Sequence, residues 1–252
     1  RVNKLILLPT TSGTGSELSY GSILTLDSTK EKIGLRGEEV AADFALVDPC
    51  LSYSMPLKIS MISGFDALTH AIETWVSKAA TNEIKNNSKR AIKNIFENLP
   101  KIFLNQSDFI AREKMCYSSM VMGLNLAISS TCLPHRLQYP IGASTDSAHG
   151  EGLAILYNSW MDHLLEVSPE KISECANWIN SNIKKINKAD FFVSAVKEFK
   201  ENIGMNPTVN SLGIDLNVAK EFPSMVSGDL SLDPSFRNYK DVEKIYIESL
   251  GI

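Results

Sequence analysis

The sequence has few cysteines, few histidines and no long hydrophobic run. Its four cysteines are scattered over 252 residues without a Cys-x-x-Cys pair, a usage typical of the reduced thiols of a cytosolic protein. No apolar stretch approaches the roughly 18 residues that a membrane-spanning helix needs. We therefore expect a cytoplasmic protein that does not interact with a membrane.

Basic residues are also too dispersed for nucleic-acid binding. The net charge is −4 and the pI is about 5.7. The densest basic segment, KNNSKR at residues 85–90, is interpreted as a solvated helix face. The content of 44% hydrophobic and 21% charged residues is that of a globular protein with one or two domains.

The sequence patterns change character near residue 56. Short apolar or alternating segments before it predict strands, and longer segments with helical periodicity follow it. The predicted strands are 5–8, 20–27, 31–36 and 44–49, and the predicted helices are 57–78, 82–99, 107–130, 150–166, 169–181, 188–202 and 216–226. We predict the remnant of an α/β domain over residues 1–56 and an all-helical domain over residues 57–252.

The first residues enter a predicted element at once. The chain begins with Arg1, and the apolar run LILL (5–8) leads straight into a turn. This layout lacks the features of a signal peptide. It predicts that the sequence starts inside a domain, so we interpret the chain as a piece of a longer protein.

Asp66 and His70 stand four residues apart in the helical stretch GFDALTHAIE (64–73). Side chains at this spacing lie on one face of a helix, here among apolar neighbours. Burying a carboxylate and an imidazole there is unfavourable unless something pairs with them. A metal ion would serve, and so would a plain hydrogen bond.

Two further histidines flank a predicted reversal of the chain. His135 and His149 are fourteen residues apart, and Pro140 and Gly142 are predicted to break the chain between them so that it turns back. With the earlier pair, they make a set of one carboxylate and three imidazoles. Such a nitrogen-rich set suits a divalent transition metal such as Zn or Fe(II), and it suits Ca or Mg poorly. The donors do not choose between Zn and Fe(II).

Taken singly, these residues have simpler interpretations. A lone histidine is more often hydrogen-bonded or on the surface, and His149 alone is compatible with the first turn of a helix. The fourth histidine, His163, is interpreted as structural because Trp160 and Leu164 continue an apolar stripe around it. The metal hypothesis therefore depends on the combination of four residues.

Six motifs follow one another along most of the chain. They are LPTTSGTGSE (8–17), EKIGL (31–35), FALVDP (44–49), SGFDALTHAIE (63–73), HRLQYPIGASTDSAHG (135–150) and RNYKDVEKIYIESL (237–250). In their residues and order they resemble the iron-containing (group III) alcohol dehydrogenase family. The resemblance implies a dinucleotide-binding α/β domain followed by a helical domain, in the dehydroquinate synthase-like fold. The tail at 237–250 is similar to the family's closing helix.

The resemblance also implies an activity and its cofactors. The family transfers hydride between an alcohol, or an aldehyde or ketone, and a nicotinamide cofactor. The resemblance therefore implies Fe²⁺ (or Zn²⁺) and NAD or NADP as cofactors. It also implies a small-molecule alcohol or aldehyde as the substrate. Because members commonly self-associate, we also expect a homo-oligomer.

The matching motif positions imply roles for particular residues. The implied metal ligands are Asp66, His70, His135 and His149, and the implied contacts to the cofactor's phosphate and nicotinamide ribose are Thr10, Thr11, Thr14 and Lys32. The turn agrees with this, since Gly13 and Gly15 let backbone amides approach an anion. Without context, the turn would be a generic glycine turn and Lys32 an ordinary strand lysine.

The sequence departs from the family in two ways. The Gly-Gly-Gly-Ser pyrophosphate loop, and the carboxylate that favours NAD over NADP, lie upstream of this turn in the family and are not in this chain. Many alcohol-oxidising members have a histidine where this chain has Tyr139. A tyrosine there is a hypothetical proton donor or a packing aromatic. Arg136, beside a predicted ligand, would attract an anionic substrate group or cover the helix surface.

Two other functions compete with the dehydrogenase. A cyclase or lyase of the dehydroquinate synthase type uses NAD transiently, but typically binds metal through Glu and two His. The other alternative is an inactive metal-binding or oligomerisation fragment that lacks half of the cofactor site.

Overall fold

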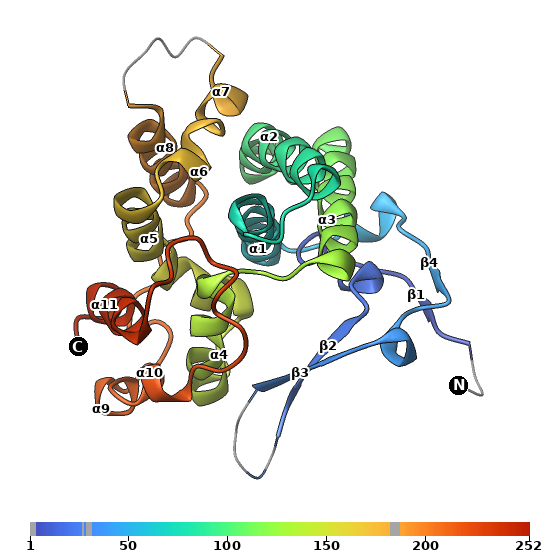
Figure 1. Cartoon of the computed structure of the whole chain (residues 1–252). Coiled ribbons are helices and arrows are strands. Elements are labelled where there is room, and N and C mark those ends of the chain that lie inside the picture. Colours follow the sequence, from blue (N-terminus) through green and yellow to red (C-terminus); the bar gives the residue numbers. More distant parts are fainter. Residues whose placement is uncertain (1–3, 27, 29–31, 182–186) are drawn as a thin grey trace. The chain divides into compact units, whose positions relative to one another are not determined.

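The structure is a computed structural model that describes residues 4–26, 28, 32–181 and 187–252. The chain folds into two compact units (Figure 1). The first comprises residues 1–24, 33–75 and 80–130, and the second comprises residues 25–32, 76–79 and 131–252. The domain boundary that the sequence places after residue 56 stays a prediction.

The strands are short, and those described all lie before residue 46. β1 (Ile6–Leu7) pairs in parallel with β4 (Phe44–Ala45), with Ile6 opposite Phe44. β2 (Gly21–Thr25) pairs with β3 (Lys32–Arg36) in a second two-stranded sheet. Two 3-10 helices lie between strands, η1 (Ser16–Leu18) and η2 (Glu38–Val40), and a third, η3 (Pro49–Ser52), lies between β4 and the first α-helix. All four predicted strands are present in shorter form, and residues 27 and 31 of the predicted ranges lie outside the described residues.

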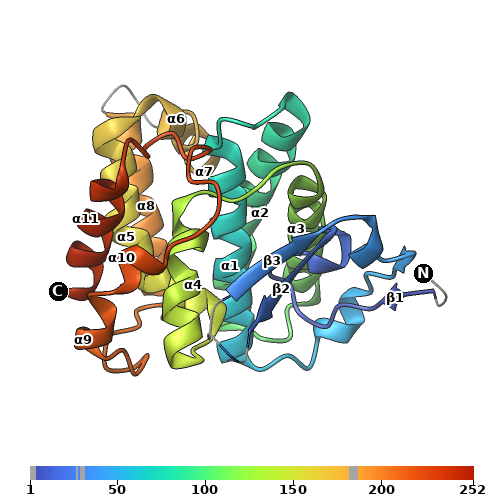
Figure 2. The ribbon, with the colours of Figure 1, turned by 60° about the horizontal axis from the view of Figure 1, so that its bottom comes forward.

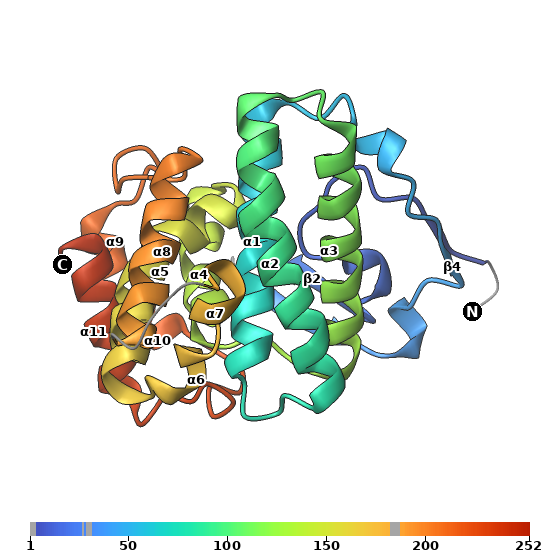
Figure 3. The ribbon, with the colours of Figure 1, turned by 90° about the horizontal axis from the view of Figure 1, so that it is seen from above.

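Three long helices form most of the first unit. They are α1 (Leu57–Val76), α2 (Asn82–Leu104) and α3 (Phe109–Ile128), which lie side by side in Figure 3. Side-chain caps fix two of their starts: Thr81 accepts from the amide of Ile84, and Asp108 accepts from the amide of Ala111. These caps explain why the predicted starts of α2 and α3 lie within two residues of the observed ones.

A buried polar cluster ties the three helices together. Thr74 of α1 and Ser88 of α2 share a hydrogen bond of 2.9 Å, and Asn125 of α3 donates to both hydroxyls at 3.3 Å and 3.0 Å. All three side chains have no exposed surface. A fully paired buried cluster of this kind fixes the register of the helices, because any slip leaves a polar group unpaired.

Eight helices make up the second unit within the described residues. They are α4 (Leu133–Thr145), α5 (His149–Val167), α6 (Glu170–Ser173), α7 (Ala176–Ile179), α8 (Lys188–Asn202), α9 (Leu216–Ala219), α10 (Phe222–Met225) and α11 (Tyr239–Leu250). Figure 2 shows α5, α8 and α11 close together. Their core contains Trp160, Phe192, Phe222 and Tyr246, which are fully buried. Burial raises the pKa of Tyr246, whose hydroxyl donates to the carbonyl of Leu137 on α4.

The observed helices differ from the predicted ones in two ways: two of them continue past a proline, and two predicted helices are interrupted. α4 runs unbroken through Pro140 and Gly142, where the sequence predicted a break, and α2 continues past Pro100. A proline inside a helix costs one backbone hydrogen bond, which tertiary contacts can offset. The predicted helices 169–181 and 216–226 are each split into two four-residue helices.

Among the residues that the structure describes, no single helix is both long and apolar enough to cross a membrane. The helices α3 and α4 reach that length and hydropathy only when they are counted as one.

Candidate metal centre

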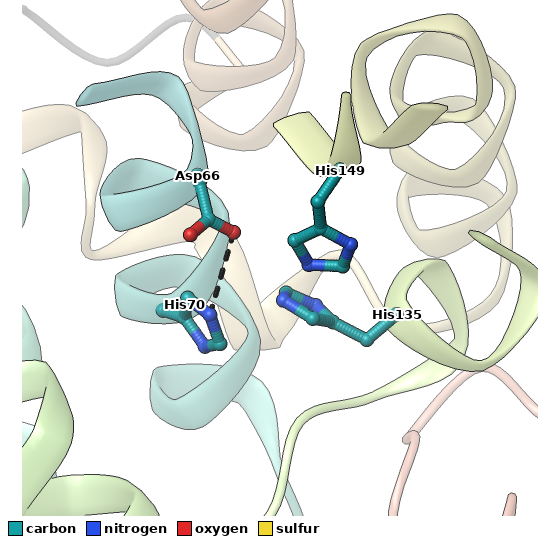
Figure 4. Close-up of side chains that lie close together, drawn as sticks. All are labelled: Asp66, His70, His135 and His149. Atoms are coloured by element: carbon teal, nitrogen blue, oxygen red, sulfur yellow. Dashed lines mark ion pairs between the residues drawn. The ribbon is translucent and has the colours of Figure 1, made fainter. Parts of the chain in front are cut away.

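The first two candidate ligands lie on one turn of α1. The Nε2 atom of His70 is 3.4 Å from Oδ1 of Asp66 (Figure 4). Both residues are buried, with 3% and 6% of their surface exposed. Thr69 and Thr74 donate their hydroxyls to the carbonyls of Asp66 and His70, each over 2.7 Å, which anchors the same stretch of backbone. The i, i+4 spacing thus places both side chains on one buried face.

The threonine-rich turn lies against the carboxylate of this pair. Thr14 donates from Oγ1 to Oδ2 of Asp66 over 2.7 Å. A Cβ atom on Gly13 would stand 3.1 Å from the same oxygen, so only a residue without a side chain fits there easily. The turn therefore contacts a candidate metal ligand directly.

Two glycines bring this turn close to α3. Gly15 has φ of 72°, and a Cβ atom on it would lie 2.1 Å from the carbonyl oxygen of Ser119. A Cβ atom on Gly123 would lie 1.9 Å from the carbonyl oxygen of Gly15. The next turn buries Glu17, and burial raises the pKa of its carboxyl group. The backbone of the turn is therefore held by close packing on α3.

The other two candidate ligands begin two consecutive helices. His135 is the third residue of α4 and is buried, and His149 is the first residue of α5 and is half-buried. Their ring centroids are 5.2 Å apart at an interplanar angle of 56°. The reversal between them follows Asp146, which ends α4 with φ of 53°. The chain therefore turns back as predicted, but after residue 145 and not at Pro140.

A buried aspartate, Asp233, fixes the start of α4 although it lies 100 residues further along the chain. Asp233 has no exposed surface, and its Oδ2 accepts from the amide of Leu133 at 3.0 Å and from Nε1 of Trp160 at 2.9 Å. Its Oδ1 accepts from the amide and hydroxyl of Ser235. Because Cys132 provides no side-chain cap, Asp233 caps the helix turn that carries His135.

A hydrogen bond from α4 also fixes the ring of His149. Nδ1 of His149 lies 2.7 Å from Oε1 of Gln138, which is fully buried. The side chain of Gln138 therefore contacts one of the two ring nitrogens and leaves Nε2 for another partner.

The four predicted ligands lie close together. Asp66, His70, His135 and His149 each offer one ligand atom, and these atoms are all within 4.8 Å of one another (Figure 4). Imidazole nitrogens and a carboxylate oxygen are donors that suit Zn and Fe(II). The donor set therefore fits a divalent transition metal.

The four residues predicted to contact the nicotinamide cofactor differ from one another in exposure and in their contacts. Thr10 and Thr11 are exposed, whereas the hydroxyl of Thr14 is engaged with Asp66. Lys32 is half-buried beside α4, where a Cβ atom on Gly142 would lie 3.3 Å from its Nζ. The cofactor roles of these residues stay predictions.

Tyr139 and Arg136 lie on the helix of His135. Tyr139 is one helical turn beyond His135, and its hydroxyl accepts from the guanidinium of Arg136 over 3.5 Å. The guanidinium carbon lies 5.8 Å from the centre of the Tyr139 ring. Hydrogen bonds from Ser231 lower the pKa of Asp229, and the charge of Arg136 lowers it further. Arg136 therefore has an acidic neighbour as well as an aromatic one.

Two residues that hold the candidate ligands, Gln138 and Asp233, were not predicted from the sequence. A glutamine in the apolar run around Leu137 and Ile141 was a signal that could have been used, whereas nothing local marks Asp233. His163, interpreted as structural, is buried with Nε2 at 3.2 Å from the carbonyl oxygen of Ser235. This contact agrees with that interpretation.

Two family models match the chain. The C-terminal model of the Fe-containing alcohol dehydrogenase family matches residues 60–250, and the iron-containing alcohol dehydrogenase model matches residues 1–49. A long-chain-alcohol dehydrogenase of Geobacillus thermodenitrificans is 34% identical over 212 residues, which are 83% of this chain and 53% of that protein. A 1,3-propanediol dehydrogenase of Citrobacter freundii is 26% identical over 250 residues, which are 96% of this chain and 64% of that protein.

Solved structures show the same fold. The crystal structure of a mutant alcohol dehydrogenase from a halo-thermophilic archaeon of a Red Sea brine pool superposes with a TM-score of 0.91 at 26% identity. The match covers 98% of this chain and 64% of that one. This chain thus spans between about half and two thirds of these three relatives. With a family model matched over residues 60–250, the chain belongs to the iron-containing alcohol dehydrogenase family.

Proposed function

We propose that this protein is a metal-dependent oxidoreductase that transfers hydride between an alcohol, or the corresponding aldehyde or ketone, and a nicotinamide cofactor. The observation that carries the proposal is the set of four ligand atoms within 4.8 Å of one another. Membership of the family supports it, and the relatives named above are alcohol dehydrogenases.

In this proposal, Asp66, His70, His135 and His149 bind one Fe²⁺ or Zn²⁺. The single negative charge of Asp66 offsets half of the charge of a divalent cation, so the site keeps a positive charge for a substrate oxygen. When bound, the cation supplies a Lewis acid to that oxygen and the nicotinamide accepts or supplies the hydride.

The cofactor and the proton have proposed partners in the chain as well. Thr10, Thr11, Thr14 and Lys32 would contact NAD or NADP, and the hydrogen bond from Thr14 would hold the turn at residues 10–17 against Asp66. Tyr139 would exchange a proton with the substrate oxygen, because its hydroxyl oxygen accepts from Arg136 and its own proton can be donated. A packing role for the Tyr139 ring is the alternative.

We also propose that the protein works in the cytoplasm as a homo-oligomer. Its four cysteines are free thiols, and only Cys50 is exposed, which suits a reducing compartment. Sedimentation velocity of the purified protein tests the oligomer, and a single species at the mass of one chain would contradict it.

The ligand assignment is tested by the metal content of a His149→Ala variant. We expect the metal content after purification and dialysis to fall by about an order of magnitude or more relative to the parent, as the loss of a direct ligand predicts. His163→Gln is the matched control, because it changes the one histidine outside the set. Equal metal in parent and His149→Ala, by elemental analysis, would overturn the assignment.

The activity is tested with simple alcohols and either cofactor. We expect steady accumulation of reduced nicotinamide with the metal-loaded parent and none with His149→Ala. Consumption of a phosphorylated substrate without net reduction of NAD would favour the dehydroquinate synthase type, although one aspartate and three histidines argue against its metal site. Calorimetric titrations that show no heat with NAD or with NADP would favour the inactive metal-binding fragment.

A further inference from the structure

A fully buried amide lies between α4 and α5 in the second unit. Gln138 has no exposed surface, and its Oε1 is 2.7 Å from Nδ1 of His149. An amide oxygen only accepts hydrogen bonds, so Nδ1 carries the proton that it accepts. The lone pair of the neutral imidazole is then on Nε2.

Two glycines leave the room that this side chain occupies. A Cβ atom on Gly142, one turn further along α4, would lie 2.6 Å from Nε2 of Gln138. A Cβ atom on Gly152 of α5 would lie 2.9 Å from the same nitrogen and 3.0 Å from Cγ. Any larger residue at either position would displace the amide, so both helices are shaped around it.

Packing alone does not account for a glutamine at this position. Nε2 of Gln138 is buried and has no hydrogen-bond partner among the protein groups that the structure describes. Burying an unpaired amide nitrogen is unfavourable, and leucine or methionine would fill a similar volume without that cost. The contact that a nonpolar side chain could not replace is the one to His149.

We propose that Gln138 is a positioning residue for the cation: its Oε1 holds His149 in the tautomer and ring orientation that present Nε2 for coordination. This inference rests on the proposed metal site. A ligating histidine commonly donates its second ring nitrogen to a carboxylate or a carbonyl group, and a neutral amide does this without changing the charge of the site.

The first test compares Co²⁺ binding by the parent, Gln138→Leu, Gln138→Glu and the exposed control Ser144→Ala. Affinity is measured by competition with a chelator, and the visible spectrum of bound Co²⁺ reports its coordination. We expect Gln138→Leu to bind Co²⁺ about 10- to 100-fold more weakly with an altered spectrum. Gln138→Glu keeps the acceptor and should restore the parent spectrum. Gln138→Leu with the affinity and spectrum of the parent would overturn the inference.

The second test does not require a variant that folds. Nitrogen-15 NMR of histidine-labelled parent without metal reports the tautomer of each ring. We expect His149 to carry its proton on Nδ1, and a proton on Nε2 would overturn the inference. A parent that binds no Co²⁺ would defeat the proposed function itself, whereas a parent that binds Co²⁺ unaffected by Gln138→Leu would defeat this inference alone.

Discussion

The hydroxyl of Thr14 donates to the carboxylate of Asp66 over 2.7 Å, so the turn at residues 10–17 is joined to a candidate metal ligand on α1. A hydroxyl group has one proton to donate and accepts with its lone pairs. While Thr14 bonds Asp66, it therefore has no proton left for a cofactor phosphate. The hydrogen bond links the turn predicted to contact the cofactor with the carboxylate proposed to bind the metal.

Thr14→Val should weaken metal binding, because it removes the hydrogen bond and leaves the carboxylate of Asp66 less well oriented. A hydrogen bond to a charged group contributes about 1.5 to 3 kcal/mol, which corresponds to a loss of roughly ten- to a hundredfold in affinity. Chelator competition with Co²⁺ measures it, and Thr14→Ser, which keeps the hydroxyl, is the control. Equal affinities for the valine and serine variants would contradict the role of this bond.

Gly123→Ala should destabilise the first unit, because the new methyl group would lie 1.9 Å from the carbonyl oxygen of Gly15. Forcing the turn off α3 should cost about 1 to 3 kcal/mol in the free energy of unfolding, measured by urea denaturation. Gly21→Ala is the control, since its new Cβ atom would meet no atom closer than 3.7 Å. The prediction fails if both variants unfold at the same urea concentration.

Asp233→Ala should be among the most destabilising substitutions in the second unit. It removes the acceptor for four donors, from Leu133, Trp160 and Ser235, in a site with no exposed surface. We expect a loss of more than about 3 kcal/mol in the free energy of unfolding. Asp229→Ala in the same loop is the control, because its carboxylate is exposed and bonds only Ser231 in the described structure. Similar losses for both variants would show that burial of the acceptor is unimportant.

The stability of the protein should depend on pH through Lys200. This lysine is 5% exposed, its Nζ donates to the carbonyl of Ala154, and burial lowers its pKa from 10.5 to about 8. Between these two values the unfolded chain binds more protons at this residue than the folded chain does. The free energy of unfolding therefore rises with pH in that window.

The measurement compares the parent with Lys200→Met. Other titrating groups cancel in the difference, so the stability of the parent relative to the variant should increase by about 3 kcal/mol from pH 7 to pH 11. Lys220→Met, at an exposed position, controls for the loss of one charge. A difference that is independent of pH would show that Lys200 keeps its ordinary titration in the folded protein.

The sequence predicted helices best where local signals decide them. α8 begins and ends where the periodicity placed it, at residues 188–202. α4 could not be predicted in the same way, because Pro140 and Gly142 are local signals for a break. The helix continues through them, and contacts from far along the chain hold it, namely the cap from Asp233 and the hydrogen bond from Tyr246 to Leu137.

The residues of the candidate site also differ in how far the sequence predicts them. The pairing of Asp66 with His70 follows from helical spacing alone. His135 and His149 were singled out by the predicted chain reversal between them, and the family resemblance added their role as ligands. The supporting residues were missed because their partners are set by tertiary structure. Gln138 meets His149 across a helix–turn–helix reversal, and Asp233 meets Leu133 from a separation of 100 residues.

Because of that separation, the cap of α4 can form only late in the synthesis of the chain. Ribosomes release the chain from its N-terminus, so Leu133 leaves the exit tunnel well before Asp233 does. Until residue 233 has emerged, the first turn of α4 lacks its carboxylate cap and the indole of Trp160 lacks its acceptor. A nascent chain that ends before residue 233 therefore lacks the carboxylate that caps the helix start that carries His135.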